Sequence, residues 1–116
     1  MTSAGSEVGQ DREDDICMVW TTFPERGIAE EWLMPLVQGG IVACGNLFSG
    51  MRSVYRWKGS VEVGEECGLL MKTTGARLNE LRAALRSHPY EVPAFVVWKV
   101  DDGAPSYLEW VRAETR

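Results

Sequence analysis

Among the side chains of this 116-residue sequence that have the chemistry of metal ligands, we single out three candidates: Cys44, His88 and Glu62. A thiolate binds soft ions such as Cu(I), an imidazole nitrogen binds many transition metals, and a carboxylate binds harder cations. Each residue also has a plainer interpretation. Most free cysteines are buried as small hydrophobes, a histidine at a helix end can satisfy a nearby carbonyl, and an exposed carboxylate is usually solvated. The residue types alone leave both interpretations open.

Three charged residues, Glu62, Glu66 and Lys72, recur with the same parity within one β-prone stretch. Side chains of equal parity point to one side of a regular strand, so the pattern predicts that all three share a face. A carboxylate pair can bind a hard cation or act as acid and base, whereas a charge row is more often a solvated surface. An ion pair across a subunit boundary, with Lys72 or Arg56, is an intermediate interpretation.

Three aromatic residues, Tyr55, Trp57 and Tyr90, form a further candidate set. They can line a small-molecule pocket, or they can anchor contacts between subunits, where tyrosine and tryptophan are enriched. We favour the subunit boundary, a place where both roles are compatible. No nucleophile, base and orienting residue can be assembled from the spacing of the candidates, so we expect a protein that is not an enzyme. No glycine-rich phosphate loop is present, so we expect no organic cofactor.

Composition and charge exclude several classes of protein. The 12 Lys and Arg against 17 Asp and Glu give a net charge of −5, which provides no basic field for nucleic acid. No apolar run approaches the roughly 18 residues that cross a bilayer, and Met1–Asp15 has no signal-peptide core. The odd set of Cys17, Cys44 and Cys67 argues against a disulfide framework and favours a reducing cytoplasm.

Hydrophobic periodicity divides the chain into an acidic tail, residues 1–14, predicted to be disordered, and one domain, residues 15–116. Strands are predicted at 16–22, 41–57 with a bend at Ser49–Gly50, 61–73 and 95–100, and helices at 23–38, 75–87 and 106–112. Thr22 and Glu25 have capping-box spacing with Pro24 in the first turn, and Pro35 is expected to kink or shorten that helix. This order predicts an α+β, ferredoxin-like βαββαβ sandwich with a long β-hairpin and a short C-terminal helix.

The last strand is apolar on both sides, which is unusual if helices cover only one face of the sheet. Val96, Trp98 and Val100 have one parity, and Phe95 and Val97 have the other. Right-handed crossovers place both helices on one face, so a monomer would leave a large apolar surface in contact with water. The pattern therefore predicts that other copies of the chain cover the second face.

With these elements in place, six segments occur in a recognisable order. They are Ala43-Cys44-Gly45-Asn46, Tyr55-Arg56-Trp57-Lys58-Gly59, Glu62 with Glu66, Met71-Lys72-Thr73, His88-Pro89-Tyr90-Glu91-Val92-Pro93 and Tyr107-Leu108-Glu109-Trp110. From about Ile16 to Thr115, the chain resembles the CutA family of divalent-cation tolerance proteins. The resemblance implies a ferredoxin-like domain that forms a tight homotrimer around a three-fold axis, and a role in tolerance to divalent metals, copper in particular.

Two departures from the family pattern remove potential metal ligands. Ala94 stands where family members usually have an acidic residue, and Ser87 stands where some have a histidine beside His88. The expected function is a cytoplasmic homotrimer that binds copper or another divalent ion in metal tolerance. The alternative is a trimeric signalling or scaffold protein, similar to the nitrogen-regulatory PII proteins, that binds a small molecule between subunits.

Overall fold

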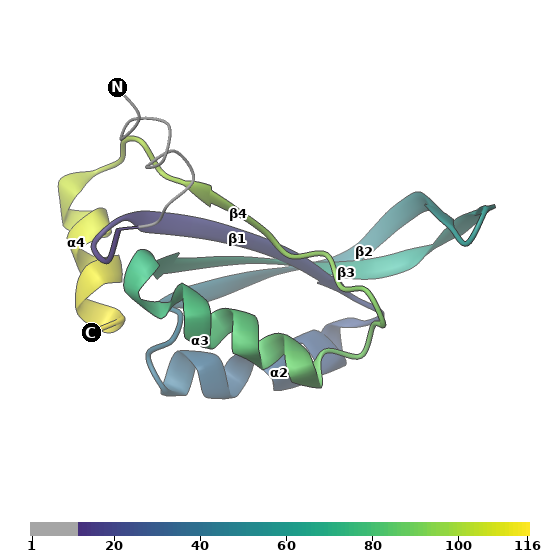
Figure 1. Ribbon diagram of the computed structural model, residues 1–116, viewed down its shortest axis with the longest axis horizontal. Coiled ribbons are helices and arrows are strands. Elements are labelled where there is room, and N and C mark those ends of the chain that lie inside the picture. Colours follow the sequence, from purple (N-terminus) through teal and green to yellow (C-terminus); the bar gives the residue numbers. More distant parts are fainter. Residues whose placement is uncertain (1–11) are drawn as a thin grey trace, which may run out of the picture.

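The computed structural model describes residues 12–116, and these form a four-stranded sheet with helices on one side (Figure 1). The elements are β1 (Ile16–Phe23), α2 (Arg26–Gln38), β2 (Cys44–Trp57), β3 (Ser60–Thr74), the 3₁₀ turn η1 (Gly75–Arg77), α3 (Leu78–Ala83), the 3₁₀ turn η2 (Ala84–Ser87), β4 (Val96–Lys99) and α4 (Pro105–Glu114). This is the predicted order, with the helix predicted at 75–87 divided into a short α-helix between two 3₁₀ turns.

The sheet has the strand order β2-β3-β1-β4, and every pairing is antiparallel. The predicted α+β architecture is therefore confirmed. The second strand begins at Cys44 rather than at Ile41, because residues 41–43 turn the chain from α2 into the sheet. Of the predicted tail, residues 1–11 lie outside the described residues, while residues 12–14 adjoin the domain: the N–H of Ala76 donates to the carbonyl of Glu13 at 3.1 Å.

The helix α2 differs from its prediction at both ends. Its N-cap is Glu25, without a side-chain capping bond, so Pro24 and the predicted Thr22 capping box lie outside the helix. Pro35 does not shorten α2, which continues to Gln38. Proline has no N–H to donate to the carbonyl four residues earlier, and a helix tolerates the loss of this one hydrogen bond near its end. The N–H of Gly39 donates to the carbonyl of Pro35 at 2.9 Å.

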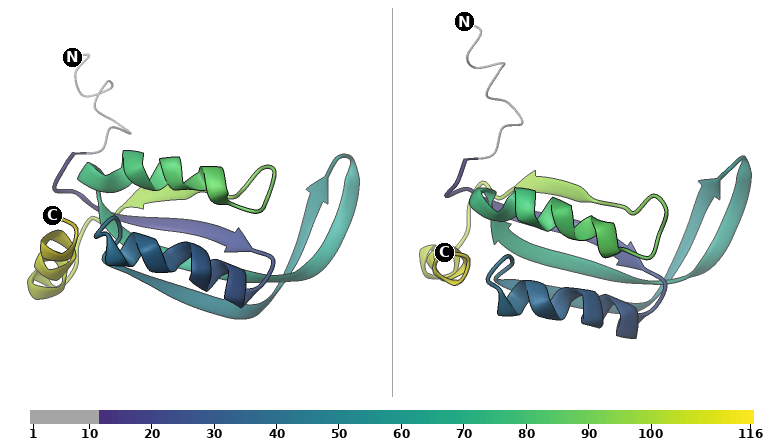
Figure 2. Two further views of the ribbon diagram at one scale, coloured as in Figure 1. Left: turned by 90° about the horizontal axis from the view of Figure 1, so that it is seen from below. Right: turned by 60° about the horizontal axis from the view of Figure 1, so that its bottom comes forward.

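The helices α2 and α3 cover one face of the sheet, and α4 packs at its end (Figures 1 and 2). We call this the covered face. Alternate residues of β1 and β3, such as Val19 and Leu69, are fully buried there against Leu33 and Leu81. A small second cluster joins Ile16 to Val111 of α4. The predicted burial of Cys17 and Cys67 is confirmed; they are 0% and 1% exposed.

No helix of residues 12–116 lies on the opposite side of the sheet, and we call this side the open face (Figure 1). Its exposed hydrophobic residues include Val96 (53% exposed), Trp98 (45%) and Phe48 (47%). Phe95 and Val97 pack toward the core, so the predicted alternation of β4 is confirmed. One exception lies beyond the strand. Val100 was predicted to share the side of Trp98, but it packs against the small cluster at α4.

The hairpin formed by β2 and β3 extends beyond the body of the sheet and then curls (Figure 2). Its register shifts between Phe48 and Met51, where Gly50 has a φ of +69°, a conformation that glycine adopts without strain. A bulge of this kind bends a strand and increases its twist. The curl brings the hairpin over the loop that follows η2, residues 88–95, and so creates the cleft described below.

Candidate binding cleft

A cleft of about 610 Å³ lies between the curled hairpin and the loop after η2. The hairpin contributes Ser53, Val54, Tyr55, Trp57 and Glu66. The loop contributes Tyr90, Glu91, Val92 and Ala94, and Thr22 adds the end of β1. The structure therefore brings together the three aromatic residues of the predicted set and Glu66. Sequence analysis missed Glu91, although it lies in a segment that carried the family resemblance.

A hydrogen bond joins the two sides of the cleft. The hydroxyl of Tyr90 donates to Glu66 Oε2 at 2.7 Å. Burial, and then the hydrogen bond to Glu66 and its charge, raise the pKa of Tyr90 well above its usual value. Tyr90 is consequently a neutral phenol at physiological pH.

A second contact crosses the mouth of the cleft. Lys58 at the hairpin turn places its Nζ 5.5 Å from the centre of the Trp57 ring, within cation–π range. The same Nζ lies 3.9 Å from Glu91 Oε1 on the loop. Both charged side chains are 71% exposed, so this ion pair is weak.

His88 lies beneath Tyr90 and is only 8% exposed. Its Nδ1 accepts the backbone N–H of Tyr90 at 3.1 Å, and its Nε2 lies 3.2 Å from Thr21 Oγ1. The ring stacks on Phe23 with 4.3 Å between centroids. Burial lowers the pKa of His88, and a backbone hydrogen bond to Thr22 opposes that shift. Because both ring nitrogens have partners, this geometry supports the structural interpretation of His88 over the metal-ligand interpretation.

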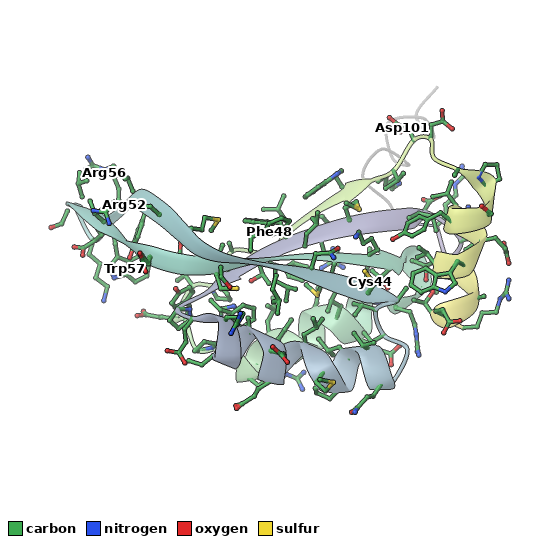
Figure 3. The ribbon with its side chains drawn as sticks, turned by 180° about the vertical axis from the view of Figure 1, so that it is seen from behind. Cys44, Phe48, Arg52, Arg56, Trp57 and Asp101 are labelled. Atoms are coloured by element: carbon green, nitrogen blue, oxygen red, sulfur yellow. The ribbon has the colours of Figure 1, made fainter. Side chains whose placement is uncertain are left out.

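Cys44 lies at the opposite end of the hairpin from Trp57 (Figure 3). It is partly exposed, and Lys72 directs its Nζ to Cys44 Sγ at 3.7 Å and also to the side-chain oxygen of Asn46. The thiol itself donates to that oxygen at 3.7 Å. Lys72, predicted to share a site with the glutamates, instead belongs to this cluster.

The three candidate metal ligands do not meet within one chain. Cys44 pairs opposite Lys72, whereas the exposed Glu62 pairs opposite Tyr55 near the hairpin turn. Glu62 and Lys72 are ten positions apart, which corresponds to about 33 Å of extended strand, so equal parity did not bring the two together. Among residues 12–116, no group of three His, Cys, Asp or Glu side chains has the arrangement of a metal site.

Comparison with known proteins gives consistent similarity over the whole domain. Residues 17–114 match the family model described as "CutA1 divalent ion tolerance protein". The divalent-cation tolerance protein CutA of Pyrococcus horikoshii is 37% identical over 100 residues, covering 85% of this chain and 97% of that one. The chloroplastic CutA protein of Arabidopsis thaliana is 33% identical, over 85% of this chain and 55% of that one. The crystal structure of CutA from Xylella fastidiosa superposes with a TM-score of 0.83 at 33% identity, covering 88% and 99% of the two chains. The family model and the Pyrococcus relative are named for tolerance to divalent ions, and none of these names describes a reaction.

Proposed function

The chain belongs to the CutA1 family of divalent ion tolerance proteins, and on that premise we propose that it is a homotrimeric metal-binding protein that acts in copper tolerance. The observation that carries the proposal is the open face of the sheet. Val96 and Trp98 on β4 and Phe48 on β2 are large hydrophobic residues exposed on this face, and monomeric proteins rarely leave a large apolar surface in water. Further copies of the chain, packed sheet against sheet, would cover it.

Cys44 is the proposed copper ligand, because it is the one partly exposed thiol among the described residues. Thiolate sulfur is a preferred ligand of Cu(I). The neighbouring Lys72 ammonium, 3.7 Å from the sulfur, opposes the approach of another cation and has to swing aside. His88 and Glu62 are the further candidates, and each would need a second copy or a local rearrangement to join Cys44.

The test is an anaerobic Cu(I) competition titration, expressed as ions per trimer. Native protein is expected to bind one or three ions saturably. Cys44→Ser is expected to weaken the affinity at least about tenfold, and Lys72→Met to strengthen it. His88→Gln tests the other candidate: because both ring nitrogens are already engaged, its affinity is expected to stay close to that of the native protein. Absence of saturable binding, or full affinity in Cys44→Ser, would refute the copper assignment.

The PII-like alternative receives less support from the cleft. Nucleotides are anionic, and phosphate groups need arginine, lysine or a cradle of backbone N–H groups. Glu66 and Glu91 line the cleft, and the described part of the chain adds no lysine or arginine to its lining. A nucleotide would therefore meet two carboxylates of its own sign.

A cytoplasmic location remains part of the proposal. It rests on three cysteines that form no disulfide in the structure, as expected in a reducing compartment. Among residues 12–116, every helix is too short or too polar to cross a lipid bilayer. Expression of a tagged full-length chain followed by fractionation tests the compartment, and recovery outside the cytoplasm would contradict it.

A further inference from the structure

The cleft between the hairpin and the loop after η2 has no part in copper binding as proposed above. We propose that it binds an organic ammonium ion, that is, a positively charged nitrogen attached to an apolar carbon skeleton. The proposal does not depend on the copper assignment, and every residue that it uses belongs to one chain.

The charge of the lining favours a cation. Glu66 and Glu91 contribute carboxylates from the two sides of the cleft, and none of the described residues that line it is basic. Glu66 accepts one hydrogen bond from Tyr90, at Oε2, which leaves acceptor positions on the carboxylate for an ammonium N–H. The neutral phenol of Tyr90 adds no charge of its own and holds the carboxylate in place.

The aromatic residues favour a cation attached to carbon rather than a hydrated metal ion. Tyr55, Trp57 and Tyr90 line the same cleft, and an ammonium group is attracted to the faces of such rings. Val54 and Val92 supply apolar lining for a carbon skeleton. A volume of about 610 Å³ lies within the range of small-molecule sites.

The chain already places an alkylammonium group at the mouth of this cleft. Lys58 Nζ lies 5.5 Å from the centre of the Trp57 ring and 3.9 Å from Glu91 Oε1. These are the two kinds of contact that a ligand ammonium would make. Because Lys58 is 71% exposed, its contact is weak, and a ligand that also buries a carbon skeleton can displace it.

The first test compares two compounds of similar shape and opposite charge. Full-length protein, in chelator-containing buffer without metal, is titrated calorimetrically with 2-phenylethylammonium and with 3-phenylpropanoate. Saturable binding of the cation is expected, at least about tenfold tighter than binding of the anion. Equal affinity for the two compounds, or no saturable binding of the cation, would overturn the proposal.

Paired variants locate the binding. Glu66→Gln is expected to weaken binding of the cation about tenfold. Its control, Glu65→Gln, removes the same charge from the neighbouring residue. Glu65 does not line the cleft, so the affinity for the cation is expected to stay unchanged. Lys58→Met is expected to strengthen binding several-fold, because it removes the competing ammonium; Arg86→Met, outside the cleft, is its control. Because Lys58 is exposed, Lys58→Met is expected to fold normally even if Glu66→Gln does not. Unchanged affinity in Lys58→Met and Glu66→Gln would contradict the assigned cleft.

Discussion

The covered face and the open face of the sheet consist of the same strands in opposite surroundings. Leu69 of β3 is fully buried under the helices, and its neighbour Leu70 points to the open face, where it is partly exposed. On β4, Val97 packs toward the core while Val96 and Trp98 are about half exposed. Both faces are apolar, so the difference lies in what covers them rather than in their composition.

This comparison separates two kinds of hydrophobic residue that look alike in the sequence. Residues of the covered face stabilise the fold of one chain, because helices of the same chain exclude water from them. Residues of the open face are expected to stabilise the assembly, and their contribution then depends on protein concentration. Variants of adjacent residues can distinguish the two.

The largest expected effect comes from the pair Leu69→Ala and Leu70→Ala. Leu69→Ala leaves a cavity in a fully buried site and is expected to lower the unfolding free energy by about 3 kcal/mol. The loss in Leu70→Ala is expected to grow with protein concentration, since it affects the contact between copies. Urea denaturation at two protein concentrations measures both. Concentration-independent losses of equal size would show that the two faces do not differ.

A smaller effect is expected where a ring lies directly on the backbone of the open face. A Cβ added at Gly68 would come within 2.3 Å of the Trp20 ring, whereas one added at Gly64 would meet nothing within 4 Å. Gly68→Ala is expected to lower the unfolding free energy by about 2 kcal/mol by displacing Trp20. Gly64→Ala is the matched control on the same strand, with little change or a slight gain. Equal denaturation midpoints for these variants would contradict the close packing of Trp20.

The smallest effect concerns the buried imidazole of His88. Burial lowers the pKa of His88 below its usual 6.5, so the unfolded chain binds a proton more readily than the folded chain. The contribution of neutral His88 to the unfolding free energy is therefore fully present above pH 6.5 and is lost as the pH falls below it. Urea midpoints between pH 8 and pH 5.5 measure the decline. A decline of the same size in His88→Gln would assign it to other groups.

The sequence predicted the fold well, because local patterns and element order suffice for that purpose. Alternating apolar residues located β1 and β3, and helical periodicity located α2 even though its N-cap was misplaced. The interruption at Ser49–Gly50 predicted a bend, and the register shift between Phe48 and Met51 confirms an irregularity there. The ends of elements were less accurate, because Pro24 and Pro35 each fit more than one position near a helix terminus.

The cleft was only partly predictable, because its geometry depends on long-range curvature. Parity along β3 grouped Glu62, Glu66 and Lys72, yet the length and curl of the hairpin separate them. Tyr90 was found as an aromatic candidate, but its bond to Glu66 joins positions 24 residues apart. His88 had the correct chemistry for a metal ligand, and only the contacts of both ring nitrogens favour its structural interpretation.

The central claim is that copies of the chain cover the open face, and sedimentation equilibrium tests it most directly. The native protein at micromolar concentration is expected to have three times the 13.0 kDa mass of one chain. Trp98→Glu, which places a charge on the open face, is expected to shift that mass toward a single chain, while Arg86→Glu on the outer surface is expected to leave it unchanged. A native mass of 13.0 kDa throughout the concentration range would contradict the claim.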